Sequence, residues 1–344
     1  MGKLARIAAA GIVTGAAAAI AERLFASPHY RGPVTDHFDG RHFQNLDPAW
    51  REQGSFWKWQ ATRVPGFWPK WIEAEPGPKP QERVGGGRMR VTLVNHATML
   101  LQVENLNILT DPIWSERCSP FAAVGPRRHR PPGIRFRDLP PIDAVVVSHN
   151  HYDHLDLPTL HRLQWKHAPR IVTQLGNGRF LARHGIRNAA EIDWWQSVDL
   201  DARVSVTSVP AQHFCARAIS DRNTALWGGF VISAPSGRAY FAGDSGWGHH
   251  FAHIADRFAP IRLAMLPIGA FLPRWFMRPV HIDPAEAVEA HRVLGAETSV
   301  AMHYGTFHLG DDGEQQPLDE LAKALAASHV DSFHVLEHGV GREV

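Results

Sequence analysis

The densest group of potential metal ligands lies in the string His149-Asn150-His151-Tyr152-Asp153-His154, directly after an apolar, β-branched run. In an extended stretch His149 and His151 point to the same side, so both imidazoles can bind one ion. Asp153 and His154 follow where the chain begins to turn and can face a second ion. Imidazole and carboxylate ligands at this density suit Zn²⁺, with Fe or Mn as competitors. Burying these groups without a metal would be costly, which disfavours the alternative of a solvated polar turn.

Three more candidate ligands each follow a predicted strand. Residues 206–210 lead to His213, residues 240–242 to Asp244, and residues 300–302 to His303. Strand ends hold side chains rigidly while the following loop stays open, as a metal site requires. The glycines that flank Asp244 let the backbone come close to a charged centre, where a carboxylate can bridge two cations. Each residue alone fits an ordinary polar side chain, but together with the first group they predict one metal centre.

Other polar residues carry a weaker signal, because the chain has 22 histidines and a single histidine is poor evidence for a site. The sequence leaves two interpretations of His96 open: a partner that hydrogen-bonds a metal ligand, or an ordinary turn residue. We interpret six further residues as structural or solvent-facing: Asp111, His129, His249, His250, His253 and His308.

The pattern of apolar residues predicts the elements that position these side chains. Strands are expected within residues 89–110 and at 142–147, 170–173, 204–209, 226–232, 238–241, 263–268, 298–302 and 333–336. Pro235-Ser236-Gly237 indicates a hairpin, and helices are expected at residues 158–165, 283–293 and 318–327. Asp283, Pro284 and Glu286 are typical of a helix start. Hairpins first, and then strands that alternate with helices, predict an α/β fold with two mixed sheets between helices.

Composition excludes several classes of protein. With 344 residues, 44% of them hydrophobic and 20% charged, the chain can bury a large core, in one large domain or two smaller ones. The formal charge of +2 and the lack of a dense Lys/Arg stripe argue against a nucleic acid partner. Cys118 and Cys215 are too few for a disulfide framework, and two reduced core thiols are favoured over one bridge.

Two segments precede the regular pattern, which starts near residue 86. Lys3 and Arg6 stand before an uncharged run at residues 7–20, which resembles a signal-peptide core or a membrane anchor, with a packed helix as the alternative. This segment, residues 1–27, predicts a membrane-associated or exported protein, with a cytoplasmic one as the alternative. Residues 28–85 are rich in proline and aromatics and predict an irregular wrapping segment. Its tryptophans are expected to pack on the core, rather than to form a membrane-facing patch with Lys58, Arg63 and Lys70. Residues 86–344 form the predicted main domain, which contains all the candidate metal ligands.

The ligand pattern resembles the metallo-β-lactamase superfamily from about residue 89 to the C-terminus. Longer strings resemble N-acylphosphatidylethanolamine-hydrolysing phospholipase D and its bacterial relatives: Pro210-Ala211-Gln212-His213, Ala225-Leu226-Trp227-Gly228, Pro267-Ile268-Gly269-Ala270, His281-Ile282-Asp283-Pro284 and His303-Tyr304-Gly305-Thr306-Phe307. The resemblance implies an αββα sandwich and two zinc ions. It places His149, His151 and His213 on one ion, and Asp153, His154 and His303 on the other, with Asp244 bridging.

This site predicts a hydrolase in which metal-bound water supplies the nucleophile. Asp153, Asp244 and His281 are the expected catalytic residues, with His281 assisting the leaving group or binding a phosphate oxygen. Arg274 and Arg278 are expected to grip phosphate, and Trp275 and Phe276 to meet acyl chains. The expected reaction is hydrolysis of N-acylphosphatidylethanolamine or a related phospholipid to phosphatidic acid. A lactonase or other small-molecule hydrolase and a non-catalytic metal-binding scaffold are the alternatives. A membrane surface is an expected partner, and a homodimer stays open.

Overall fold

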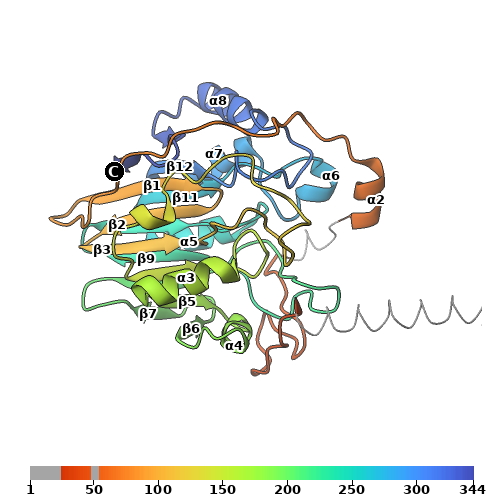
Figure 1. Ribbon diagram of the computed structural model, residues 1–344, viewed down its shortest axis with the longest axis horizontal. Helices are drawn as coiled ribbons and strands as arrows, with labels where there is room; N and C mark the ends of the chain where they lie inside the picture. Colours follow the sequence, from red (N-terminus) through yellow and green to blue (C-terminus); the bar gives the residue numbers. More distant parts are fainter. Residues whose placement is uncertain (1–24, 48–53) are drawn as a thin grey trace, which may run out of the picture.

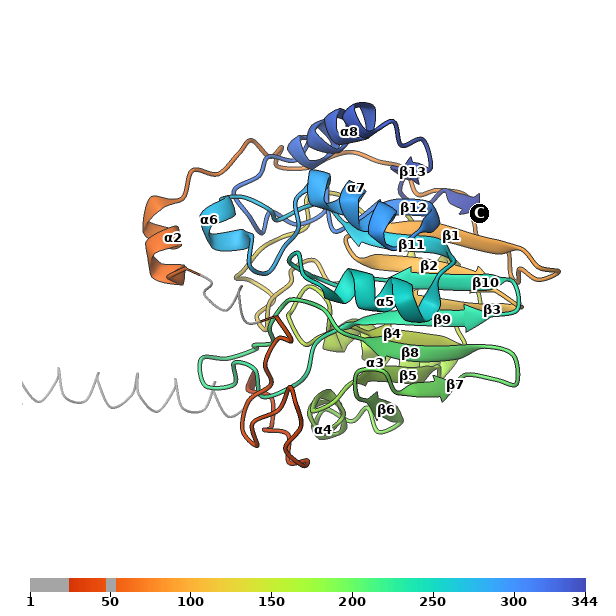
Figure 2. The same cartoon turned by 180° about the vertical axis from the view of Figure 1, so that it is seen from behind.

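The computed structural model describes residues 25–47 and 54–344, and two seven-stranded sheets stacked face to face form their centre (Figure 1, Figure 2). Both sheets mix parallel and antiparallel pairs, and helices cover both outer faces. The prediction of an αββα sandwich is therefore confirmed.

The first sheet begins with the chain's antiparallel meander and ends with parallel strands. In order across the sheet, its strands are β14 (Gly341–Glu343), β1 (Met89–Asn95), β2 (Thr98–Val103), β3 (Leu106–Thr110), β4 (Ala144–Val147), β5 (Arg170–Gln174) and β6 (Ala189–Ile192). β3 to β6 run parallel to one another, so their carboxyl ends lie at one edge of the sandwich.

The second sheet has the same size and a similar mixture. Its order is β13 (Phe333–His334), β12 (Ala296–Met302), β11 (Ile261–Pro267), β10 (Gly237–Phe241), β9 (Gly229–Ala234), β8 (Ser205–Val209) and β7 (Ser197–Asp199). β9 and β10 form the hairpin that Pro235-Ser236-Gly237 predicted. β10 to β13 are parallel, which again collects carboxyl ends at one edge.

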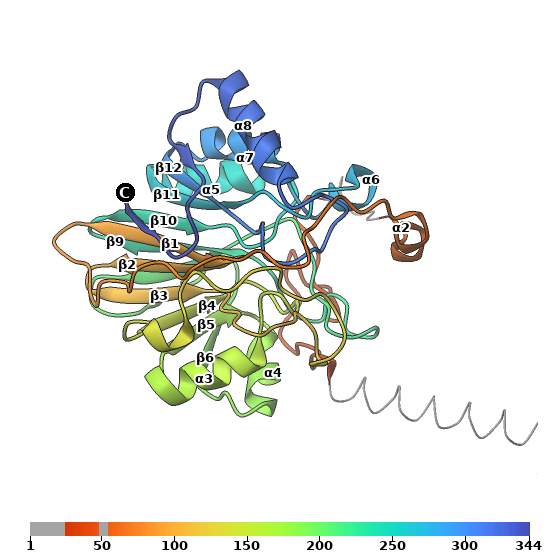
Figure 3. The same cartoon turned by 45° about the horizontal axis from the view of Figure 1, so that its top comes forward.

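The helices complete four layers, which Figure 3 shows from above. α3 (Leu157–His167) and α4 (Asn177–Arg183) lie on the first sheet. α5 (His250–Phe258) and α7 (Pro284–Val293) lie on the second, and α8 (Gln316–Ser328) packs against α7. Two short helices, α2 (Phe56–Thr62) and α6 (Arg274–Met277), lie side by side beyond the sheets, and a 3-10 turn, η2 (Phe136–Asp138), precedes β4.

α7 starts where the sequence predicted a helix start. The Asp283 side chain accepts a hydrogen bond from the Glu286 backbone N–H (2.8 Å), and Glu286 accepts one from the Asp283 N–H (3.1 Å). This capping box satisfies two N–H groups that the first turn leaves without helical partners. It fixes the position of His281, two residues upstream.

β4 illustrates why a continuous apolar run forms a central strand. Val145 and Val147 face the α3 and α4 layer, whereas Ala144 and Val146 face the other sheet, and all four are fully buried. Both faces of a parallel strand are covered, so alternation with polar residues is lost. Cys118 and Cys215 are both buried and free, as expected.

The described part of the aromatic segment before β1 contains no extended strand and runs along the outside of the sandwich (Figure 1). Trp59 of α2 is buried against Phe276 and Met277, which agrees with the expected packing. Trp57 and Phe67 are instead 79% and 83% exposed, so the expectation that the aromatics serve as core anchors holds only in part.

The prediction that the chain is membrane-associated or exported through its N-terminal apolar segment is corrected. Across residues 25–47 and 54–344, the model contains no helix with the length and apolar character needed to cross a membrane. The predicted segment falls mostly within residues 1–24, outside the described residues.

Candidate metal centre

The predicted ligands converge at the edge where the strands of both sheets end. His149, His151, Asp153 and His154 follow β4 of the first sheet. His213 follows β8, Asp244 follows β10 and His303 follows β12, all in the second sheet. The site therefore spans the two sheets and is built from loops that the strands hold at their ends.

Three histidines form the first group. Nε2 of His149 lies 2.9 Å from Nδ1 of His151, and Nε2 of His213 lies 3.3 Å from the same atom. The far nitrogen of His213, Nδ1, donates to the Val280 carbonyl (2.9 Å), so its Nε2 carries the lone pair that faces the group. Nδ1 of His149 lies 2.9 Å from the Ser148 hydroxyl. These contacts fix the ring orientations, as they do for metal-binding histidines.

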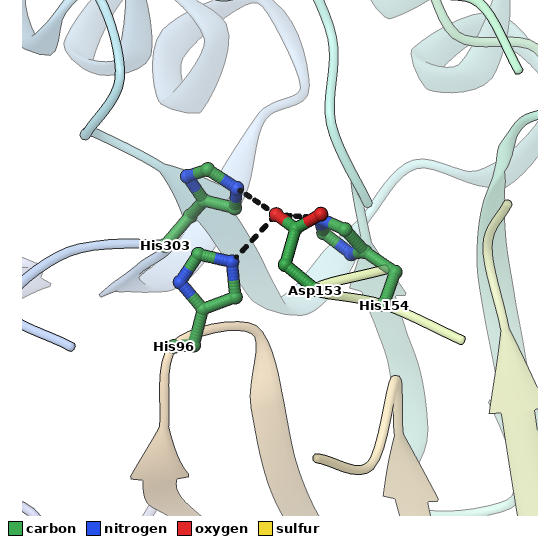
Figure 4. Close-up of side chains that lie close together, drawn as sticks. All are labelled: His96, Asp153, His154 and His303. Carbon is green, nitrogen blue, oxygen red and sulfur yellow. Dashed lines mark hydrogen bonds and ion pairs between the residues drawn. The ribbon is translucent and has the colours of Figure 1, made fainter. Parts of the chain in front are cut away.

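The second group contains Asp153, His154 and His303, together with His96 (Figure 4). Oδ2 of Asp153 lies 3.1 Å from Nε2 of His154 and 3.4 Å from Nε2 of His303. Nε2 of His96 lies 2.9 Å from the same oxygen. The structure thus places His96 beside a predicted ligand, which favours the first of its two interpretations.

Asp244 lies between the two groups. Its Oδ2 lies 3.1 Å from Nε2 of His154 and 3.8 Å from Nε2 of His213, and its Oδ1 lies 3.2 Å from Nε2 of His303. This is the position that a carboxylate bridging two ions would take. Gly243 makes the approach possible, since its backbone has φ +61° and a Cβ there would come within 2.8 Å of the Ser148 Cβ.

Burial keeps the first group neutral. It lowers the pKa of His151 to about 4 and that of His213 to about 3, and it also holds the pKa of His149 well below its ordinary value. Near pH 7 all three rings therefore present lone pairs, which is the state in which histidine binds a metal.

The second group has the opposite electrostatics. Burial disfavours a charged His303, but Asp244 and Asp153 outweigh it and raise the pKa of His303 to about 9. The pKa of His154 is likewise raised against burial, by Asp244, Asp153 and Asp111. Burial alone would raise the pKa of both Asp153 and Asp244, yet neighbouring histidines hold each well below its usual range. The two carboxylates, Asp153 and Asp244, thus favour nearby positive charge, and without a metal the protonated His154 and His303 rings provide it.

The donor set fits divalent metal ions. Nε2 of His154 and Nε2 of His303 lie within 3.2 Å of the Asp244 carboxylate, but these two atoms and Oδ1 of Asp244 are buried without a well-aligned hydrogen bond among the described residues. Buried polar atoms normally have aligned partners, so a group of such atoms that face one another indicates a site for a ligand. Imidazole nitrogens and carboxylate oxygens suit Zn²⁺ and also Fe or Mn.

Asp111, which the sequence left as structural or solvent-facing, supports the site directly. It is fully buried, its Oδ2 accepts from Nδ1 of His154 (2.6 Å), and Oδ1 accepts from the Ser148 N–H (2.7 Å). Asp111 follows β3 immediately, so the strand-end signal that identified Asp244 was present here as well. The other histidines interpreted as outside the site stay outside the cluster: His129, His249, His250, His253 and His308.

A cavity of about 630 Å³ opens onto the cluster. His281 lines it, with Nδ1 4.0 Å from Oδ2 of Asp244, and Phe276 lines it as well. Arg274, Trp275 and Arg278 are not among the described lining residues.

The expectation that Arg274 and Arg278 grip phosphate stays a prediction, and in the structure both lie beside Glu286 of α7. Arg274 is held by Glu286 (2.6 Å) and by the carbonyl of His281 (2.9 Å). Arg278 lies 3.6 Å from Glu286. Both guanidinium groups thus lie beside the acidic first turn of α7.

Comparison with known proteins agrees with this geometry. Residues 106–304 match the family described as the Beta-lactamase superfamily domain. An uncharacterized protein of Mycobacterium tuberculosis is 38% identical over 318 residues, which cover 88% of this chain and 81% of that protein. The N-acyl-phosphatidylethanolamine-hydrolyzing phospholipase D 1 of Caenorhabditis elegans is 37% identical over 248 residues, 69% of each chain.

A solved structure shows the same fold. The metallo hydrolase Igni18 of Ignicoccus hospitalis superposes with a TM-score of 0.57 at 18% identity, over 75% of this chain and 98% of that one. The family match covers more than half of the chain, and the two-sheet sandwich and the histidine–aspartate cluster agree with it. The chain therefore belongs to the β-lactamase superfamily and is a metal-dependent hydrolase.

Proposed function

We propose that the protein is a zinc-dependent phosphodiesterase of the phospholipase D type, which cleaves N-acylphosphatidylethanolamine or a related phospholipid to phosphatidic acid. The observation that carries the proposal is the character of the cavity. One end is the histidine–aspartate cluster, and the described remainder is mostly apolar: Phe56, Trp59, Phe214, Phe276, Met277, Val280 and Leu309, with Gly54 and Arg222. An apolar wall of this kind suits an acyl chain, whereas a lactone or sugar phosphate would call for a small polar pocket.

Arg222 supplies the charge that the apolar wall lacks. It is the one Lys or Arg among the described residues that line the cavity, and its guanidinium carbon lies 4.0 Å from the Phe214 ring centroid. Phe214 in turn packs edge-on against His151, with ring centroids 4.5 Å apart. Arg222 is exposed, so it lies where the charged headgroup of an amphiphile would enter while the chain contacts the aromatic wall.

The ligand allotment follows from the two groups. His149, His151 and His213 would hold one ion, Asp153, His154 and His303 the other, and Asp244 would contact both. Two zinc ions in this donor set would supply a hydroxide at neutral pH and a positive charge for phosphate oxygens.

His281 is suited to a hydrogen bond with a phosphate oxygen. Burial lowers its pKa to about 3, so the ring is neutral near pH 7 and carries one N–H. A neutral ring at the cavity wall can donate that hydrogen bond without adding charge. Hydrolysis breaks the P–O bond that joins the phosphate to the N-acylethanolamine group. The hydroxide of water ends on phosphorus, which gives phosphatidic acid, and the proton ends on the oxygen of the released N-acylethanolamine. The C. elegans relative, named for this reaction, supports the substrate class.

The test is release of phosphatidic acid from N-acylphosphatidylethanolamine in detergent micelles, by protein whose metal content has been measured. Asp244→Asn is expected to lower the rate by more than about 100-fold, because one carboxylate contacts both groups. Asp256→Asn, an exposed change on α5, is the matched control and should keep the wild-type rate. A chain with two metal ions that hydrolyses lactones but releases no phosphatidic acid would contradict the phospholipase assignment and retain the hydrolase.

A further inference from the structure

His96 lies in the turn between β1 and β2 and contacts the second metal group from the first sheet. Its carbonyl accepts from the His303 N–H (2.8 Å), and its own N–H donates to the Thr306 hydroxyl (2.9 Å). Its ring centroid lies 4.0 Å from that of His303, and the side chain is 99% buried. A single turn residue therefore joins the end of β12 to the first sheet.

The backbone of His96 has a φ of +45°, which lies in the left-handed region that non-glycine residues rarely adopt. A non-glycine residue is strained there, because its Cβ crowds the backbone. Such conformations persist where surrounding contacts fix them, and they gather at functional sites. His303, the ligand that His96 contacts, also has a positive φ of +61°. The two strained residues hold each other through the hydrogen bond between them.

The imidazole of His96 acts on Asp153. Nε2 lies 2.9 Å from Oδ2 of Asp153 (Figure 4), and a lone pair on Nε2 would repel the carboxylate. The proton must therefore be on Nε2, which donates to Asp153. Nδ1 is then the acceptor nitrogen, and it has no hydrogen-bond partner among the described residues.

His96 also differs from His154 and His303 in which carboxylates its ring contacts. His154 and His303 each lie within 3.5 Å of both carboxylates, Asp153 and Asp244. Across residues 25–47 and 54–344, His96 forms an ion pair with Asp153 alone. An ion held between the two carboxylates would be reached by His154 and His303, while His96 contacts Asp153 from one side.

We propose that His96 is a positioning residue: it orients the Asp153 carboxylate by a hydrogen bond and thereby sets the affinity of the second metal position, without binding the ion itself. The proposal rests on the ligand set given above and is independent of which bond the enzyme cleaves. A carboxylate held in one orientation loses less conformational freedom when it binds an ion, so the donor strengthens binding.

The experiment measures metal binding rather than turnover. Metal-free wild type, His96→Leu and His96→Gln are titrated with Co²⁺ against a competing chelator, and the visible spectrum of each Co²⁺ form is recorded. The glutamine amide can donate from about where Nε2 does, whereas leucine cannot donate. His129→Leu, which removes a histidine outside the cluster, is the matched control. Far-UV circular dichroism and metal-free melting show which variants remain folded.

The expected result is two ions in every variant, with the first bound as in wild type. The second ion should bind about 10- to 100-fold more weakly in His96→Leu. His96→Gln should recover most of this loss, and the shape of the Co²⁺ spectrum should be retained. Wild-type affinity in folded His96→Leu would overturn the proposal. If both variants lose the second ion and the Co²⁺ spectrum changes, His96 is a metal ligand and the proposal is overturned. If both ions bind equally more weakly, His96 acts through packing and the proposal is likewise overturned. A wild type that binds one ion would overturn the ligand set itself.

Discussion

Oδ2 of Asp111 lies 2.6 Å from Nδ1 of His154, with both side chains fully buried. The Asp111 carboxylate accepts a hydrogen bond from the Nδ1–H of His154, so Nε2 on the opposite side of the ring faces Asp153 and Asp244. Such carboxylate–histidine pairs orient a metal-binding ring and make it a stronger ligand.

Asp111→Asn should therefore weaken metal binding. The amide keeps an acceptor but loses the negative charge, so we expect affinity for the second ion to fall about 10- to 100-fold and kcat/KM to fall with it. Excess metal should restore part of the activity. Metal analysis after dialysis and a metal titration of activity test this. Unchanged affinity in the folded variant would contradict the role given to Asp111.

Metal binding should release protons. His303 has a pKa of about 9 in the metal-free chain and the pKa of His154 is also raised, so both rings carry protons at pH 7 that an ion must displace. The apparent affinity should thus rise with pH, roughly tenfold per unit for each displaced proton, and level off once the pH passes the raised pKa values. Calorimetry in buffers of different ionisation enthalpy counts the protons. Binding without proton release would show that both rings are neutral before the ion arrives.

Arg222→Gln should affect substrate binding more than chemistry. Loss of the guanidinium at the cavity is expected to raise KM for an anionic phospholipid by roughly 10-fold, while kcat changes little. Arg222→Lys should recover part of the loss, because it keeps the charge without the bidentate geometry. An uncharged ester of similar chain length serves as the comparison substrate, and its KM should not change.

Arg274→Gln is the matched variant for Arg222, because Arg274 binds Glu286 outside the described cavity lining. It should lower the melting temperature and leave KM as in wild type. A KM that rises in Arg274→Gln and not in Arg222→Gln would reverse the assignment of the two arginines.

Gly243→Ala should damage the centre as well as the fold. The left-handed backbone costs an L-residue about 1–2 kcal/mol, and the added Cβ would come within 2.8 Å of Ser148. We expect a lower melting temperature and weaker metal binding, since Asp244 must shift. Gly295 has a similar φ of +58° but open space around it, so Gly295→Ala should lose stability alone. Metal binding that weakens equally in both variants would show that crowding at Ser148 is not the cause.

Much of this arrangement was predictable because strand patterns and strand ends are local signals. The run that forms β4 and the ligands behind it lie within about ten residues, so periodicity and spacing were enough to find both. Asp111 gave the same strand-end signal but stood alone, and lone carboxylates at strand ends are common. Its pairing with His154 depends on the neighbouring positions of β3 and β4, which the sequence does not state.

The arginines show that closeness in sequence does not by itself establish a role at the same site. Arg274 and Arg278 stand close to His281 in sequence, which suggested a role at the substrate. The sequence also contains another partner for them, since Asp283 and Glu286 form the capping box of α7 and lie beside these guanidinium groups. Arg222 lies eight residues beyond Phe214, and the folded loop after β8 brings both side chains to the cavity.

The division of the cluster between two sheets has a consequence for assembly. The β4 loop brings its residues from one half of the sandwich, while His213, Asp244 and His303 come from the other, so neither half could retain an ion by itself. An ion bound by ligands from both sheets would link the two sheets, and its binding free energy would stabilise their packing against each other. Removal of the metal by a chelator should then weaken the packing of the two sheets first at this edge. Hydrogen exchange of the backbone amides at the strand ends should become faster and would report how much metal is bound.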